Sequence, residues 1–191
     1  MNAAFDARQF RDAVGWFTTG VTVITTRAAS GAPVGITANS FSSVSLDPPL
    51  VQFGLDRRAL SLPAFRSFGH FAVSILAEDQ QGLSSRFAKP GGDKWRDIDF
   101  EVWGSGCPVL RGVLAALDCR TEAVHEGGDH LVFIGRVLRL EARRHGRPLL
   151  FSRGAYHALG DRLGIADTPM QRLRAGGEEA VLSGLEPWFA A

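Results

Sequence analysis

Strand-like runs joined by short links constrain the fold of this chain more than any other feature of its sequence. Residues 21–26 (VTVITT) are almost entirely β-branched, and residues 50–55 and 71–76 are similar apolar runs. Residues of this kind favour the pleated surface of a sheet. No regular alternation of strands with long helices appears, so a doubly wound parallel sheet is not expected. The pattern predicts a mainly β domain.

Two longer runs predict a large hairpin. Residues 113–125 and 131–143 are strand-like, and the intervening EGGDH contains glycines that suit a tight turn. A strand beginning at Val34 and a short last strand at 155–159 complete the set. Because most links are short, we expect an antiparallel barrel with helices attached to it.

Short helices are predicted beside the strands. Asp6 and Gln9 have capping-box spacing, which predicts that a first helix begins here and ends at Gly20. Its buried face should consist of large apolar residues spaced three to four positions apart: Phe10, Val14 and Phe17. Two further helices are expected at 62–68 and 79–87, and residues 89–106 are expected to form a loop.

The chain has 191 residues, which suits one domain with an appendage. We predict a barrel domain over residues 1–160 and a C-terminal helical extension over residues 161–191. The net charge of +1 and the lack of a dense basic block argue against a nucleic-acid partner. The sequence shows no signal-peptide pattern and no membrane-spanning run, so a cytoplasmic protein is expected.

Metal and thiol chemistry are not expected. Cys107 and Cys119 lack the CxxC spacing of a redox pair, and are interpreted as buried thiols. The five histidines lack ligand-like spacing, so we predict no metal site. The common catalytic and nucleotide-binding motifs are also missing. An organic cofactor that carries the difficult chemistry itself would need few protein acids or bases.

The stretch GITANSFSSVSLDPPLV at residues 35–51 is the strongest indication of function. It carries no charge before Asp47 and is crowded with small hydroxyl and amide side chains. Such a run is too polar for a core strand and too apolar at its ends for a solvated linker. It suits a wall that meets a flat, partly polar ligand.

The motifs VTVIT, GITANSFSSVSLDPPLV, FAVSIL, LSSRFA and EGGDHLVFIGRV occur in this order over residues 10–159. Together they resemble the flavin reductase family, whose members have the FMN-binding split-barrel fold. The resemblance implies an antiparallel split β-barrel of Greek-key type with flanking short helices and a helical C-terminal tail. It also implies reduction of FMN or FAD by NADH or NADPH, a homodimer, and delivery of reduced flavin to a separate monooxygenase.

The uncharged run should contact the flavin ring through backbone groups and short polar side chains. N–H donors near the ring would also stabilise the negative charge that reduction leaves on it. The predicted contacts are Thr37, Ala38, Asn39, Ser40, Ser43, Val44 and Ser45. The alternative is an ordinary polar strand and turn with satisfied hydroxyls.

Two regions could hold the flavin phosphate. Arg57 and Arg58 precede a predicted helix that begins near Ser61, and helix N-termini attract anions. Ser84 and Arg86 in LSSRFA match the hydroxyl-containing stretch of the family. Solvated surface arginines are the plainer interpretation.

By resemblance, His130 in the GDH turn would place NADH or NADPH over the flavin and is the predicted catalytic residue. Tyr156 and His157 could close the same pocket. A histidine beside Gly-Gly-Asp could equally serve only the turn, and Tyr156 could simply pack on the barrel. The basic run RVLRLEARRHGR is either a solvated strand face or an attraction for the NADPH ribose phosphate.

The favoured function is therefore an NAD(P)H-dependent flavin reductase in which the protein aligns the two rings and excludes water. One alternative is a non-catalytic FMN-binding or electron-carrier module of the same fold. Another is a split-barrel oxidase that acts on a pyridoxal-type phosphate. The sequence does not decide between FMN and FAD, or between NADH and NADPH. The tail, which contains Trp188 and Phe189, is expected to brace the dimer or dock the oxygenase.

Overall fold

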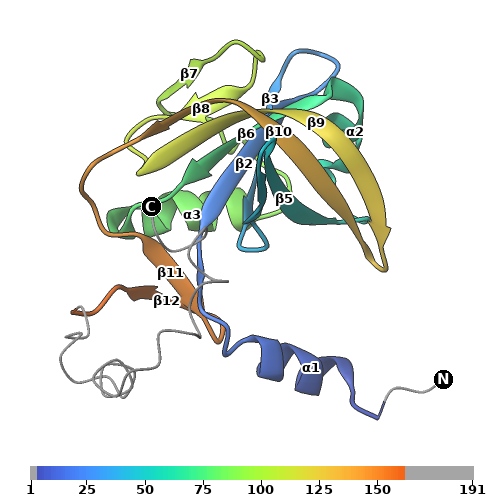
Figure 1. Ribbon diagram of the computed structural model, residues 1–191, viewed down its shortest axis with the longest axis vertical. Helices are drawn as coiled ribbons and strands as arrows, with labels where there is room; N and C mark the ends of the chain where they lie inside the picture. Colours follow the sequence, from blue (N-terminus) through green and yellow to red (C-terminus); the bar gives the residue numbers. More distant parts are fainter. Residues whose placement is uncertain (1–3, 162–191) are drawn as a thin grey trace, which may run out of the picture. The chain divides into compact units, whose positions relative to one another are not determined.

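The computed structural model describes residues 4–161, which form three antiparallel sheets and several short helices (Figure 1). The helices are α1 (Ala7–Val14), α2 (Leu62–Phe68), the 3-10 turn η1 (Glu78–Gln80) and α3 (Gln81–Ala88). The strands are β1 (Thr19–Gly20), β2 (Thr22–Arg27), β3 (Pro33–Ala38), β4 (Ser42–Leu46), β5 (Pro49–Asp56), β6 (His70–Ile75), β7 (Phe100–Val102), β8 (Pro108–Leu110), β9 (Ala115–Gly127), β10 (His130–Ala142), β11 (Leu149–Ser152) and β12 (Ala155–Ala158).

The main sheet has seven strands in the order β3-β2-β6-β9-β10-β5-β4, and every neighbouring pair is antiparallel. Strands β3 and β4 follow each other in sequence but lie at opposite edges of this sheet. Two small sheets, β1-β11-β12 and β7-β8, accompany it. For the described residues, the predicted mainly β antiparallel fold with short flanking helices is confirmed.

Two apolar clusters fix α2 and α3 against the main sheet. In the first, the rings of Phe53 and Phe133 stack with centroids 5.0 Å apart, and Phe65 of α2 packs edge-on against both. In the second, Phe87 of α3 is fully buried and meets Trp95 edge-on at 5.1 Å. Buried aromatic pairs of this kind dominate core energetics, so the two helices are held firmly beside the sheet.

Gly35 is required by the packing of α3 against β3. A Cβ atom at this position would lie 2.6 Å from a Phe87 ring carbon and 3.2 Å from a Trp95 ring carbon. Only a residue without a side chain lets the edge strand approach these rings so closely.

Several predicted elements are confirmed. The β9–β10 hairpin turns at Gly128 and Asp129, and α2 has the predicted bounds, with Gly69 in the left-handed region after it. Strand β12 and the turn-helix pair η1–α3 also match their predicted positions. At the N-terminus, the Asp6 carboxylate accepts from the Gln9 N–H and the Gln9 side chain accepts from the Asp6 N–H.

The predicted end and buried face of the first helix are wrong. Helix α1 ends at Val14 because Gly15 caps it, and the Gly15 carbonyl then accepts from the Arg153 N–H. Phe10, Val14 and Phe17 are exposed, Phe17 by 80%. The spacing was that of an amphipathic helix, but within the described residues no other element covers this face.

Short strands were also missed. Strand β7 lies in the segment expected to be a loop, and β8 and β11 were not predicted. Strands of three or four residues are too short to show a periodic pattern. Cys107 and Cys119 are buried free thiols, as predicted. The predicted helical extension, apart from Asp161, lies outside the described residues.

Candidate functional site

A cavity of about 400 Å³ lies along the β3 edge, between the segment that leads into α2 and the end of α3. Its size is in the range of small-molecule sites, about 300–1,000 Å³. Six residues predicted from the sequence line it: Thr37, Ala38, Asn39, Ser40, Ser61 and His130. The structure therefore brings the first part of the uncharged run together with the turn histidine.

Strand β3 offers free backbone groups to this cavity because it is an edge strand, paired only with β2. In an antiparallel pair, alternate residues direct their N–H and C=O away from the neighbouring strand. The Gly35 carbonyl accepts from Lys94, so the backbone groups of Thr37, two residues on, share this outward direction. The Thr37 hydroxyl donates to the Ser84 carbonyl of α3 (2.6 Å), which fixes its position.

Ser40 joins the end of the β3 segment to β5. Its hydroxyl accepts from the Gly54 N–H (3.0 Å) and donates to the Gly54 carbonyl (3.2 Å). The imidazole of His130 lies against the same point, since a Cβ on Gly54 would be 3.8 Å from the ring. His130 Nδ1 is 2.8 Å from the Asp129 carboxylate, and this hydrogen bond lowers the pKa of Asp129. The ring is therefore oriented beside Ser40, at the rim of the cavity.

The second part of the uncharged run does not join the cavity. Ser43, Val44 and Ser45 belong to β4, at the opposite edge of the sheet from β3. After β3 ends at Ala38, the chain forms β4, which pairs only with β5. The register of this pair shifts between Ser43 and Ser45. The expectation of one continuous wall from residue 37 to 45 is not met in the described chain.

Both predicted arginines of the phosphate seat have internal partners. Arg57 donates to the Gly128 carbonyl (2.8 Å) and forms an ion pair with Glu126. Arg58 donates to the Asp56 carboxylate, with an N···O distance of 2.9 Å. The side-chain and backbone hydrogen bonds from Arg58 lower the pKa of Asp56 to about 2. Neither arginine lines the cavity, although Asp56 does.

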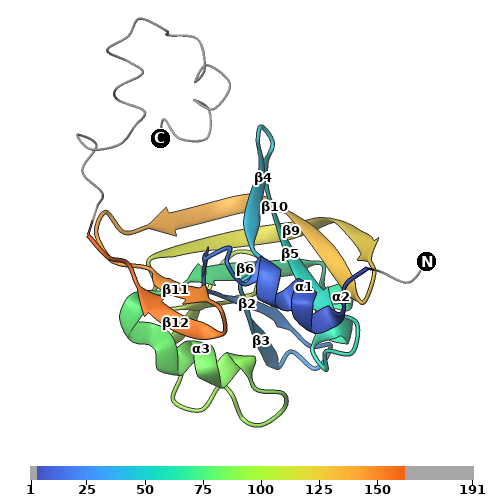
Figure 2. The same ribbon diagram turned by 90° about the horizontal axis from the view of Figure 1, so that it is seen from below.

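The residues of the second predicted phosphate site, Ser84 and Arg86, also have internal hydrogen-bond partners. Ser84 is fully buried, and its hydroxyl lies 2.8 Å from the hydroxyl of Tyr156. Figure 2 shows α3 and the β11–β12 hairpin side by side, and this hydrogen bond joins them. Arg86 donates to the Arg96 carbonyl (2.7 Å), and His157 is an exposed residue of β12. Ser84, Arg86, Tyr156 and His157 are not among the residues that line the cavity.

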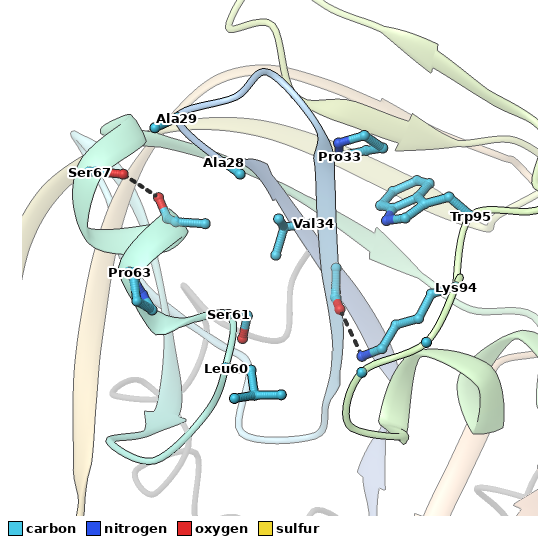
Figure 3. Close-up of a pocket in the computed structure, with 14 residues that line it drawn as sticks. Ala28, Ala29, Pro33, Val34, Leu60, Ser61, Pro63, Ser67, Lys94 and Trp95 are labelled. Atoms are coloured by element: carbon cyan, nitrogen blue, oxygen red, sulfur yellow. Dashed lines mark hydrogen bonds between the residues drawn. The ribbon is translucent and has the colours of Figure 1, made fainter.

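Sequence reasoning missed the two lysines. Lys89 and Lys94 are the only lysines in the chain, and both line the cavity. Lys94 donates to the Phe87 carbonyl (3.0 Å) and to the Gly35 carbonyl of β3 (3.4 Å), and Figure 3 shows it reaching this strand. Burial lowers the pKa of its amine. The two lysines lie five residues apart in a chain otherwise rich in arginine, and this feature of the sequence could have indicated the site.

The donor set fits a ring that carries a phosphate. The hydroxyls of Thr37 and Ser40 already donate to protein carbonyls, so the outward backbone groups of Thr37 and the side-chain amide of Asn39 are the neutral groups that can pair with the polar edge of a flavin. Lys89 and Lys94 supply positive charge for a phosphate at the α3 end of the same cavity. Within residues 4–161, no cluster of three or more His, Cys, Asp or Glu residues could hold a metal ion. Nor does any helix in this range have the length and apolarity to cross a bilayer.

Comparison with known proteins gives independent information on the family of this chain. The FMN reductase (NADH) SmoA of Agrobacterium fabrum is 48% identical over 151 residues, which cover 79% of this chain and 85% of that protein. The flavin-dependent monooxygenase reductase subunit HsaB of Rhodococcus jostii is 47% identical, with coverage of 80% and 78%.

Among solved structures, the NADH:FAD oxidoreductase SgcE6 of Streptomyces globisporus, in complex with NAD and FAD fragments, is 35% identical. The two structures superpose with a TM-score of 0.76, and the alignment covers 85% of this chain and 96% of the SgcE6 chain. The family model of the flavin reductase like domain matches residues 14–160. The chain therefore belongs to the flavin reductase-like domain family.

Proposed function

We propose that this protein is an NADH-dependent flavin reductase that supplies reduced flavin to a partner monooxygenase. The observation that carries the proposal is the cavity at the β3 edge, which brings together six of the predicted site residues and both lysines. The identity of 48% to an NADH-dependent FMN reductase and of 47% to a monooxygenase reductase subunit supports the same activity and the same kind of partner.

Each group has a defined role in this proposal. The flavin, once bound, supplies the redox chemistry by accepting a hydride from NADH. Thr37, Asn39 and Ser40 hold the polar edge of the ring, and Lys94 holds the phosphate. His130 positions the nicotinamide nucleotide at the rim of the cavity. The chain contributes alignment and electrostatic stabilisation, so it needs no general base in this step.

The protein is further proposed to be a homodimer. Helix α1 and the segment after it expose large apolar side chains, with Trp16 exposed by 68% and Phe17 by 80%. Leu46 on the β4 edge is exposed by 64%. Apolar surface of this kind is typical of protein–protein contacts. The residues after 160 remain predicted to brace the dimer or dock the oxygenase, and a cytoplasmic location remains a prediction.

Steady-state mixing of the protein with NADH and excess FMN tests the proposed activity. We expect many turnovers of NADH loss per protein molecule. Flavin that stays bound through gel filtration without NADH loss would indicate a binding module instead. Oxygen-dependent oxidation of pyridoxamine phosphate without NADH loss would indicate the oxidase alternative. NADPH in place of NADH, and FAD in place of FMN, then rank the donors and acceptors.

A further inference from the structure

The turn that presents His130 receives little support from the main sheet. Gly127 and Gly128 stand at its tip, and Gly128 has a φ of +71°. Glycine loses more conformational freedom than any other residue when a turn is ordered. Strand β9 pairs with β6 only up to Arg120, so in the described chain its last residues have β10 as their one partner strand. The tip of the β9–β10 hairpin (Figure 1) therefore needs support from its other side.

Arg57 gives this support from the end of β5. Strand β5 pairs with β10 up to the turn, and Arg57 is the first residue after the strand. The N–H of Arg57 donates to the Asp129 carbonyl (3.0 Å), and its guanidinium donates to the Gly128 carbonyl (2.8 Å). The same guanidinium forms an ion pair with Glu126 of β9. Because hydrogen bonds from a charged donor are stronger than neutral ones, this one residue ties the turn to the sheet.

The contacts of Arg57 reach His130 through the backbone of the turn. The Asp129 carbonyl that accepts from Arg57 belongs to the peptide group that contains the His130 nitrogen. Since a peptide group is planar, holding this carbonyl also fixes the direction in which His130 leaves the turn. The Asp129 carboxylate, 2.8 Å from His130 Nδ1, then orients the imidazole. Arg57 does not line the cavity, whereas His130 does, so Arg57 can act on the site only through the turn.

We propose that Arg57 is a positioning residue for His130. It holds the hairpin turn so that the imidazole stays at the rim of the cavity, where it meets the nicotinamide nucleotide. This role takes the place of the phosphate contact that the sequence predicts for Arg57. The inference rests on the proposed function, in which His130 positions NADH. Loss of Arg57 should therefore weaken the use of NADH and leave the binding of flavin unchanged.

A double-mutant cycle tests the proposal, because residues that act through one another have non-additive effects. Arg57→Met keeps a long side chain without its charge or donors, and should lower kcat/KM for NADH about fivefold, mainly by raising KM. His130→Ala should lower kcat/KM about tenfold, and the double variant should also lose about tenfold and no more. The Kd of FMN should stay within about twofold in all three variants.

Arg120→Met is the matched control. Arg120 is an exposed arginine of the same hairpin that pairs with Glu122 (3.3 Å) and does not line the cavity. Its replacement should leave kcat/KM for NADH within about twofold. Amide hydrogen exchange gives a readout that is independent of turnover. Peptides covering residues 126–130 should exchange faster in Arg57→Met than in Arg120→Met or the unaltered protein.

Several results would overturn the proposal. A loss of about fiftyfold in the double variant would show that Arg57 and His130 act independently. A rise of more than about fivefold in the Kd of FMN in Arg57→Met would show that Arg57 contacts the flavin instead. Unchanged kcat/KM in Arg57→Met, or an effect of Arg57→Met where His130→Ala has none, would also contradict it. The proposed function fails in a different way, since the unaltered protein would then show no turnover of NADH.

Discussion

The two edge strands of the main sheet come from one uncharged stretch of sequence but have different surroundings. Strand β3 is covered by α3, and its residues line the cavity. Strand β4 is uncovered in the described chain, with Val44 exposed by 40% and Leu46 by 64%. Both strands present an open edge, but only β3 lies between helices that wall off a cavity. The covering elements, more than the composition of the edge strand, decide which edge can hold a ligand.

The strongest test of this difference compares two glycines. Gly35→Ala on β3 would place a Cβ 2.6 Å from the buried Phe87 ring, whereas Gly54→Ala on β5, beside β4, finds its nearest neighbour at 3.6 Å. We expect Gly35→Ala to lower the free energy of unfolding by about 2 kcal/mol because the core is overpacked. Gly54→Ala should stay within about 1 kcal/mol. Denaturant unfolding of both variants measures this, and equal losses would contradict the account.

The two kinds of cation provide the next test. Lys94→Met removes the positive charge beside the proposed phosphate and should raise the Kd of FMN at least about tenfold, since hydrogen bonds to charged groups contribute about 1.5–3 kcal/mol. Arg58→Met removes a cation already paired with Asp56 and should change the Kd less than about twofold. Fluorescence titration separates them. A larger effect at Arg58 would restore the original prediction for the phosphate seat.

The same lysine gives a pH dependence. Only the protonated amine of Lys94 would attract the proposed phosphate, and burial lowers the pKa of this amine from its usual value of 10.5. FMN affinity should therefore weaken as pH rises, and the loss should begin at a lower pH than an exposed lysine would give. Lys94→Met should lack this part of the pH dependence. An identical profile in the variant would show that Lys94 does not contact the phosphate.

His130 tests whether the turn at the rim acts on the nicotinamide nucleotide. His130→Ala should lower kcat/KM for NADH about tenfold, equivalent to about 1.4 kcal/mol. FMN affinity should change little, because in the proposed arrangement His130 at the rim of the cavity contacts the nicotinamide nucleotide and not the flavin. Steady-state kinetics with parallel FMN titrations provide the check. Unchanged kinetics would remove His130 from the site.

The smallest effect compares polar side chains on the two edges. Asn39→Ala removes one neutral hydrogen-bonding group and should raise the Kd of FMN about fivefold, close to 1 kcal/mol. Ser43→Ala, from the same stretch but on β4, should have no measurable effect. A matching loss at Ser43 would mean that β4 also contacts the flavin, for example across a subunit contact.

The sequence predicted well the features that depend on local signals. The capping box of Asp6 and Gln9, the bounds of α2 and the β9–β10 hairpin all follow from neighbouring residues. The position of β4 at the far edge of the sheet could not be predicted in this way, because strand order depends on which distant strands pair. Ser84 was predicted to bind phosphate, but whether a hydroxyl faces a ligand or Tyr156 is decided by packing between distant elements.

Amide hydrogen exchange followed by mass spectrometry, with and without saturating FMN, tests the central claim most directly. The free N–H groups along the β3 edge should pair with the flavin, so peptides covering residues 36–40 should exchange more slowly when FMN is present. Peptides covering residues 42–46, in the uncovered strand β4, should exchange at the same rate with and without FMN. Exchange that is unaffected at residues 36–40 would contradict the assignment of this cavity to flavin.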